Sequence, residues 1–306
     1  MEPRFSNNMR WITIILILFS ALPVFALSDW VVSTEEWVSV HHHPKETANV
    51  QAILDAVYFS YPLISENLGL KFTGKLEIYL ASKPAEFGEL TDWKLPAWAQ
   101  GVAYSGKNMV VLKSPKYSGN RVDLAKAAVH EFIHILLATD VGRVPLWLNE
   151  GLAVMLSGEG YFDDRQLTNA AITGKFVPFR KMERVLKFDP GSAHLAYQQA
   201  LAATRYLVGE FGWGSVSRML AGVKHGQAFD KAFFDATGMW PDEFEGEWIK
   251  LQGGRYKYSF LKNFDSYISY VFVPLLLLGG LAAYLRRRRI LKRWKREEQY
   301  FDFGDY

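Results

Sequence analysis

The stretch His130-Glu131-Phe132-Ile133-His134 decides how this chain is interpreted. Residues four apart on a helix share one face, so His130 and His134 can offer ring nitrogens to the same metal ion. Glu131 follows the first histidine and can reach a water molecule bound to that ion. Zinc takes nitrogen and oxygen ligands in tetrahedral geometry, and a catalytic site keeps one position for water. The pattern therefore predicts a catalytic zinc site that needs a third protein ligand.

A second stretch, residues 145–153, reads Pro-Leu-Trp-Leu-Asn-Glu-Gly-Leu-Ala and contains the candidate third ligand, Glu150. This glutamate opens another helical segment after a loop that is long enough for the chain to turn back. Pro145 is suited to the first turn of that helix. Gly151 within a helix costs about 1 kcal/mol relative to alanine. We therefore expect Gly151 to permit a close approach of the two helices that carry the ligands.

The residues around the two histidines are almost all apolar, which favours a metal site over an ordinary surface helix. A mostly apolar helix is a buried one, and two histidines and a glutamate within it need polar partners. A metal ion would satisfy all three side chains. The alternative is a helix whose histidines are solvated or hydrogen-bonded. The apolar neighbours are Ala127, Ala128, Val129, Phe132, Ile133, Ile135, Leu136 and Leu137.

The two stretches together resemble the gluzincin metallopeptidases, in which a glutamate on a following helix is the third zinc ligand. Residues 147–151, Trp-Leu-Asn-Glu-Gly, are similar to the third-ligand segment of gluzincin aminopeptidases. The short spacing and the Pro-x-Trp-Leu-x-Glu-Gly-Leu-Ala pattern look more like bacterial peptidase MA-like domains. The resemblance extends from about Trp37 to Trp248. It implies a zincin-like α+β fold, with a small mixed sheet before a mostly helical part, Zn2+ as cofactor, and a peptide or protein substrate.

The resemblance also implies roles for two residues outside the ligand set. Zinc lowers the pKa of its bound water, and Glu131 would take the proton of that water and pass it to the leaving amine. Gluzincins commonly use a tyrosine or histidine after the third ligand to stabilise the tetrahedral intermediate. Tyr197 is the expected donor here, with His194 as the alternative. The competing interpretation is that Tyr197 is a packed aromatic side chain with a satisfied hydroxyl.

Two departures from the gluzincin patterns narrow the expected activity. Gluzincin aminopeptidases hold the amino end of the substrate with a Gly-Ala-Met-Glu-Asn stretch, whereas residues 101–104, Gly-Val-Ala-Tyr, lack the acid. An endopeptidase is therefore expected rather than an exopeptidase. Thermolysin-like enzymes place an acid one turn after the third ligand, where this chain has Val154. The partners of the zinc-binding histidines are thus unassigned.

Composition excludes several classes of site and partner. The chain has 306 residues, a formal net charge of +3 and no cysteine. Without cysteine there is no disulfide scaffold, no cysteine zinc site and no cysteine nucleophile. Much of the positive charge lies in residues 286–296, beside an apolar run, where a membrane explains it better than nucleic acid does. We expect no nucleic-acid partner, and no feature indicates an oligomeric state.

The N-terminal residues have the layout of a secretory signal peptide, at 1–26. Arg4 and Arg10 precede an apolar run at 11–22, and Val24-Phe25-Ala26 offers a possible cleavage point. The alternative is an uncleaved signal anchor. In either case the middle of the chain is expected outside the cytoplasm.

A second apolar run predicts a transmembrane helix at 267–285, which is about the length that a bilayer requires. Pro274 is tolerable within such a helix. The basic cluster follows at once, and cationic flanks stay cytoplasmic. The sequence therefore predicts a cytoplasmic tail at 286–306 and an extracytoplasmic catalytic part held by one C-terminal span.

Between the two apolar runs, we expect a sheet and zinc-helix part at 28–158, a helical part at 159–252 and a tether at 253–266. The alternation at 75–80 predicts a strand, and residues 99–104 and 108–112 predict a strand pair. This pair either lines the substrate cleft, as in zincins, or is an ordinary hairpin. Residues 30–40 are expected to form one strand.

Helix signals are clearest at 47–68, where apolar spacing is helical and Gly69 ends the run. Asn120 is expected to cap the zinc helix, and Ser192 is expected to cap a helix that ends at Phe211. The predicted function is that of a membrane-anchored zinc metallopeptidase. The alternative is a membrane-bound binding or assembly protein that keeps a gluzincin fold without turnover.

Overall fold

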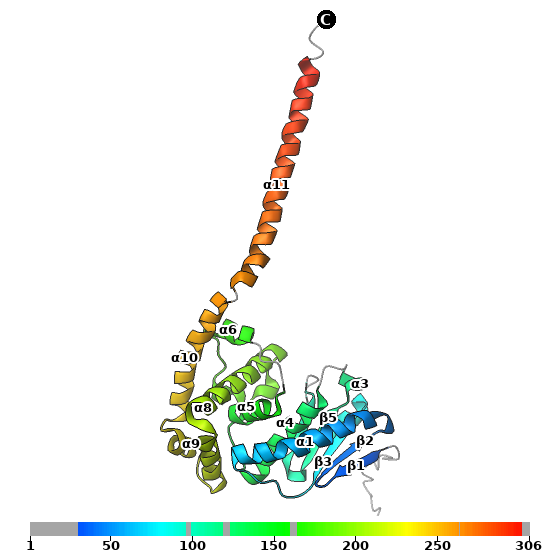
Figure 1. Ribbon diagram of the computed structural model, residues 1–306, viewed down its shortest axis with the longest axis vertical. Helices are drawn as coiled ribbons and strands as arrows, with labels where there is room; N and C mark the ends of the chain where they lie inside the picture. The colour runs from blue at the N-terminus through cyan, green and yellow to red at the C-terminus, as the bar shows by residue number, and fades with distance from the viewer. Residues whose placement is uncertain (1–29, 96–98, 119–122, 160–163, 263, 302–306) are drawn as a thin grey trace, which may run out of the picture.

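The computed structural model describes residues 30–95, 99–118, 123–159, 164–262 and 264–301. The N-terminal part contains a five-stranded sheet with the strand order β1-β2-β3-β5-β4 (Figure 1). Its inner strands β2, β3 and β5 are parallel, and β1 and β4 pair antiparallel at the two edges. The strands are β1 (Val31–Glu35), β2 (Val38–His42), β3 (Leu76–Ala81), β4 (Gly101–Tyr104) and β5 (Met109–Lys113).

Two long helices, α1 (Thr47–Leu68) and α4 (Leu124–Asp140), cover one face of the sheet. The alternation of β3 explains this: Leu76, Ile78 and Leu80 face the main core, while Ala81 lies in a smaller cluster on the other face. The short helix α2 (Pro84–Leu90) closes that second face. One side of α4 thus packs against strands β4 and β5 of the sheet.

The rest of the body is helical, and α5 packs between α4 and α8. Expected and observed architecture agree: the protein is α+β, with a mixed N-terminal sheet followed by a mostly helical part. The helices are α5 (Leu146–Ser157), α6 (Asp164–Thr173), α7 (Phe179–Met182), α8 (Pro190–Lys224), α9 (Phe229–Thr237) and α10 (Pro241–Lys262). The short elements are η2 (Pro44–Glu46), η3 (Ser105–Lys107), η4 (Val185–Lys187) and α3 (Pro115–Ser118).

Most of the strong local patterns formed the expected elements. Helix α1 spans the predicted residues and ends at Gly69, whose φ of 67° is left-handed. Strand β3 and the β4–β5 pair are also confirmed. The single strand expected at 30–40 is wrong: the chain forms a β1–β2 hairpin around a two-residue turn. Glu36 takes a φ of 48° in that turn, although the sequence there lacks the usual glycine or asparagine signal.

Two predicted helix caps are replaced by aspartates. Asp123 caps α4, because its carboxylate accepts a hydrogen bond from the Lys126 backbone N–H. Asn120 lies outside the described residues. At α8, Asp189 accepts from the backbone N–H groups of Gly191 and Ser192, so Ser192 is not the cap. The predicted helix end at Phe211 is confirmed, because Gly212 has non-helical backbone angles (φ 74°, ψ 163°) and the second half of α8 is a separate helical segment beyond this kink.

The expected tether at 253–266 is largely the end of α10, and α11 (Phe264–Phe301) extends away from the body (Figure 1). In the described part of the chain, none of the helices has both the length and the apolarity needed to cross a membrane. The transmembrane helix predicted at 267–285 therefore has no support from the structure. The signal peptide predicted at 1–26 lies outside the described residues.

Candidate metal centre

Helix α4 presents His130 and His134 side by side, as their spacing predicts. Their ring centroids are 4.7 Å apart and nearly perpendicular, with an interplanar angle of 79°. His130 is buried, with 9% of its surface exposed, and His134 is half-buried. Apolar neighbours such as Phe132 and Ile133 are fully buried and hold this turn of α4 against the core. The two rings are therefore held close together on the same side of α4.

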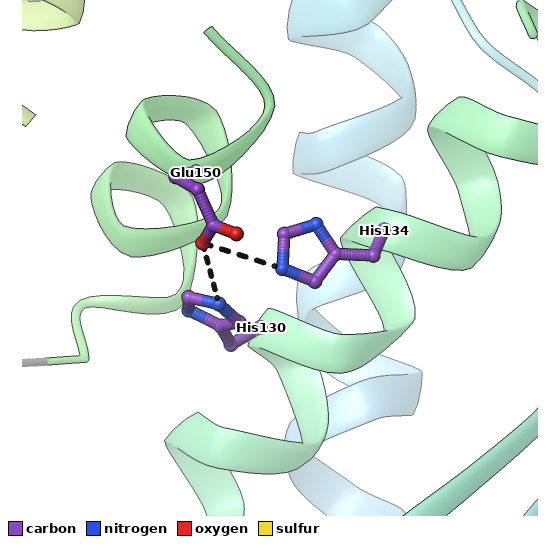
Figure 2. A group of neighbouring side chains, drawn as sticks. All are labelled: His130, His134 and Glu150. Carbon is purple, nitrogen blue, oxygen red and sulfur yellow. Dashed lines mark ion pairs between the residues drawn. The ribbon is translucent and has the colours of Figure 1, made fainter. Parts of the chain in front are cut away.

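Glu150 reaches the same point from α5 (Figure 2). One of its oxygens, Oε2, lies 3.5 Å from His130 Nε2 and 3.6 Å from His134 Nε2. These separations are long for hydrogen bonds, and this buried oxygen has no hydrogen-bond partner among the described residues. The three side chains form a group whose ligand atoms all lie within 4.8 Å of one another. Two imidazole nitrogens and a carboxylate oxygen around one point match the ligands of a catalytic zinc.

The outer nitrogen of each histidine faces a side-chain oxygen, from Asn149 in α5 for one and from Glu159 just after α5 for the other. His134 Nδ1 donates to the Asn149 side-chain oxygen at 2.9 Å. His130 Nδ1 lies 2.8 Å from Glu159 Oε2, in an ion pair without hydrogen-bond alignment. Such partners orient imidazole ligands and set which nitrogen faces the metal. Here both Nε2 atoms face Glu150, so the three side chains could bind one ion together.

Glu159 and Asn149 are the functional candidates that the sequence analysis missed. Val154, where thermolysin-like enzymes have an acid, is half-buried and does not fill this role. The αL residue Gly158 ends α5, and the turn there brings Glu159 to His130. The signal in the sequence that could have indicated Glu159 was its position directly after a glycine that ends a helix. Nothing in the local pattern, however, relates it to a histidine 29 positions earlier.

Electrostatic interactions bind the group together. Burial alone would lower the pKa of His130, but its contacts with Glu150 and Glu159 outweigh burial and hold that pKa well above the ordinary value. Burial raises the pKa of Glu150, yet the two histidines outweigh it and keep the pKa low. Each shift thus reflects the attraction between a histidine ring and the Glu150 carboxylate. A divalent cation at the same point would compete with protons for these side chains.

Glu131 is separate from the ligands and faces the edge of the sheet. A Cβ atom on Gly101, the first residue of β4, would lie 2.9 Å from Glu131 Oε1 and 2.7 Å from Leu112 Cδ2. Only a glycine leaves room for the carboxylate in this position. Burial raises the pKa of Glu131 above its ordinary value, although the two histidines act in the opposite direction and lower it. A carboxylate with a raised pKa beside a metal site is suited to accept a proton.

A family model for the Peptidase MA superfamily matches residues 63–252. The chain belongs to this superfamily. The match covers the candidate ligands, their partners and the helices as far as the middle of α10, and it begins within α1 rather than near Trp37. No curated protein matches the chain.

Within this superfamily domain, α8 brings Tyr197 but not His194 to the centre. Tyr197 is half-buried and lines a pocket together with Glu150. Burial, with the charges of Glu150, Glu131 and Glu159, raises the pKa of its hydroxyl well above the ordinary value. A hydroxyl that stays protonated can act as a hydrogen-bond donor. His194 is exposed on the same helix. The catalytic roles of Tyr197 and Glu131 remain predictions.

Gly151 serves a different contact from the one expected. A Cβ atom there would lie 2.0 Å from Thr204 Oγ1 and 2.5 Å from the Ala200 carbonyl oxygen. Both atoms belong to α8, not to α4. The prediction that Gly151 lets the two ligand helices approach is therefore wrong, since the atoms nearest to Gly151 belong to α8. Glu150 of α5 and Tyr197 of α8 line the same pocket.

Proposed function

We propose that the protein is a zinc-dependent peptidase that hydrolyses internal peptide bonds. The observation that carries the proposal is the group of two histidines and a glutamate around one point, where a buried Glu150 oxygen has no hydrogen-bond partner in the described part of the chain. His130, His134 and Glu150 would hold the ion. Zinc bound there would supply Lewis-acid chemistry, polarising a carbonyl and making water more acidic.

The chain's own residues account for the proton transfers. Glu131 takes a proton from the attacking water and then delivers it to the leaving amine, which needs a base near the metal but outside its ligand set. Tyr197 donates a hydrogen bond to the oxygen on which negative charge develops. Glu159 and Asn149 keep both histidines turned toward Glu150.

The endopeptidase assignment is supported by the edge strand β4. It pairs only with β5 in the sheet and borders Glu131 through Gly101. An extended peptide can add to such an edge and pass on in both directions. Gly101, Val102, Ala103 and Tyr104 offer no acid for a substrate amino terminus. We therefore favour a zincin-like arrangement in which the peptide runs along β4.

The test is hydrolysis of a mixed peptide library by the purified protein, with and without a chelator. We expect cleavage at internal bonds, loss of cleavage with the chelator and recovery when zinc is restored. Intact peptides under all three conditions would instead support a binding or assembly protein without turnover.

We also propose that the catalytic part lies outside the cytoplasm and is attached to the membrane, with residues 286–306 inside. This part of the proposal rests on the sequence: the apolar runs at 11–22 and 267–285 and the basic cluster after the second run. A tag placed after Tyr306 should be protected from protease added to intact cells. Digestion of the tag from outside would contradict this topology.

A further inference from the structure

The last part of α11 concentrates positive charge on a helix that extends away from the body (Figure 1). Eight of the eleven residues at 286–296 are lysine or arginine, and none is acidic. The whole chain has 35 basic and 32 acidic residues, so without these eight its formal net charge would be −5 instead of +3. This segment therefore supplies the entire positive excess. The eight are Arg286, Arg287, Arg288, Arg289, Lys292, Arg293, Lys295 and Arg296.

The three apolar residues of the segment share one side of the helix. Ile290 and Leu291 lie four and three residues before Trp294, and such spacings bring side chains onto one face. At about 100° per residue, the three fall within about 100° of the circumference. Arg287 is the one basic residue on that side, and the other seven spread over the opposite half. The segment is thus amphipathic, with a narrow apolar side and a broad cationic side.

Both sides of the segment are exposed. Ile290 is 41% exposed, Leu291 47% and Trp294 59%, and the basic residues between them are exposed as well. A partner that matches both sides must offer anionic groups beside an apolar layer. A bilayer surface that contains anionic phospholipid offers phosphates at the level of the headgroups and acyl chains just below them. Nucleic acid offers the phosphates but no apolar layer for the two aliphatic side chains.

We propose that residues 286–296 bind the surface of an anionic membrane. Ile290, Leu291 and Trp294 face the boundary of the acyl chains, where tryptophan is favoured. The lysine and arginine side chains extend to the phosphates around them. Where the apolar run at 267–285 crosses the bilayer, this contact requires α11 to bend near Leu285. The inference rests on the membrane attachment proposed above and adds the class of lipid. It is independent of peptide cleavage, because no residue of the metal centre takes part.

The absence of cysteine from the sequence allows a direct test, because one introduced cysteine can carry an environment-sensitive dye. Ile290→Cys places the dye on the apolar side, and Lys292→Cys places it on the cationic side as the matched control. Each full-length protein is reconstituted with vesicles of phosphatidylcholine, alone or with about one third phosphatidylglycerol. The dye at position 290 should shift to an apolar emission only with phosphatidylglycerol. Salt at about 0.5 M should largely reverse the shift, because it screens the charges.

Charge removal measures the electrostatic part of the binding. Each basic side chain near an anionic surface contributes about five-fold to association. Arg288→Gln combined with Arg289→Gln should therefore move the equilibrium between bound and free segment, followed by the dye at position 290, by about 30-fold. The control combines Lys75→Gln with Lys181→Gln, two exposed lysines of the body, and should leave this equilibrium unchanged.

Several outcomes would overturn the inference. An equal shift of the dye at position 290 without phosphatidylglycerol would remove the preference for anionic lipid. Equal shifts at positions 290 and 292 would remove the apolar side. Duplex DNA is the competing polyanion, and a shift with DNA as large as that with anionic vesicles would assign the segment to nucleic acid. Failure of the protein to associate with either vesicle would overturn the proposed membrane attachment as well, whereas the peptide-library test would stand unaffected.

Discussion

The candidate metal centre has a sheet side and a helix side, and a glycine borders each. On the sheet side, Gly101 of β4 adjoins the ends of two side chains, the Glu131 carboxylate and a Leu112 methyl group. On the helix side, Gly151 of α5 adjoins backbone and a β-branched side chain of α8. The sheet side therefore makes room for the proposed base Glu131, whereas the helix side allows close packing of α5 on α8. Changes on the first should affect turnover, and changes on the second should affect metal retention or folding.

The largest effect is expected for Glu131→Gln. Glutamine keeps the size and hydrogen-bonding capacity of this side chain but cannot accept the proton. Loss of a general base typically costs about a hundred- to ten-thousand-fold in rate. The variant should retain its zinc content and melting temperature while kcat falls by that factor. Cleavage at the parent rate would show that the sheet side takes no part in the chemistry.

Gly101→Ala tests the sheet side without changing a polar group. The added methyl group would contact the ends of Glu131 and Leu112, which can move. We expect a small loss of stability but a fall in kcat of up to about a hundred-fold, because small displacements of a catalytic group are costly. Zinc affinity should stay at the parent value. If zinc binding falls while kcat per bound zinc does not, the distinction between the two sides is wrong.

Glu159→Gln tests metal retention on the helix side. Removing the charge beside His130 Nδ1 should weaken zinc binding by about 10- to 100-fold, as is typical for partners of metal-binding histidines. Competition with a chromogenic chelator measures this affinity. Glu66→Gln, an exposed substitution on α1, is the control and should bind zinc like the parent. Equal affinities in the two variants would remove Glu159 from the metal centre.

Gly151→Ala should mainly affect folding. The new methyl group would meet the Ala200 carbonyl oxygen, which cannot move without α8, and overpacking of this kind costs about 1–3 kcal/mol. Urea unfolding measures the change. The control is Gly209→Ala in α8, where a Cβ atom meets nothing within 4 Å and alanine should stabilise the helix by up to about 1 kcal/mol. Equal stabilities of the two variants would contradict the packing role of Gly151.

What the sequence could predict lies within single elements, and what it could not predict lies in contacts between elements. Helix α1 and the pairing of His130 with His134 depend on spacing within one element, and local periodicity is sufficient for both. The contact of Glu159 with His130 and that of Gly151 with α8 depend on how separate elements pack. No local pattern encodes either contact.

Turns and caps were intermediate cases. The β1–β2 hairpin was missed because Glu36 adopts a left-handed conformation that usually requires glycine or asparagine. Asp189, rather than Ser192, caps α8, and both residue types are good caps. Propensity alone could not choose between candidates three residues apart.

Zinc content measured in the parent and in Glu150→Ala tests the central claim most directly. The account predicts one zinc ion per parent chain after dialysis, bound by the two histidines and Glu150. It also predicts a folded Glu150→Ala variant that loses zinc at chelator concentrations the parent withstands. Full zinc occupancy with parent affinity in Glu150→Ala, or no zinc uptake by the parent, would contradict it.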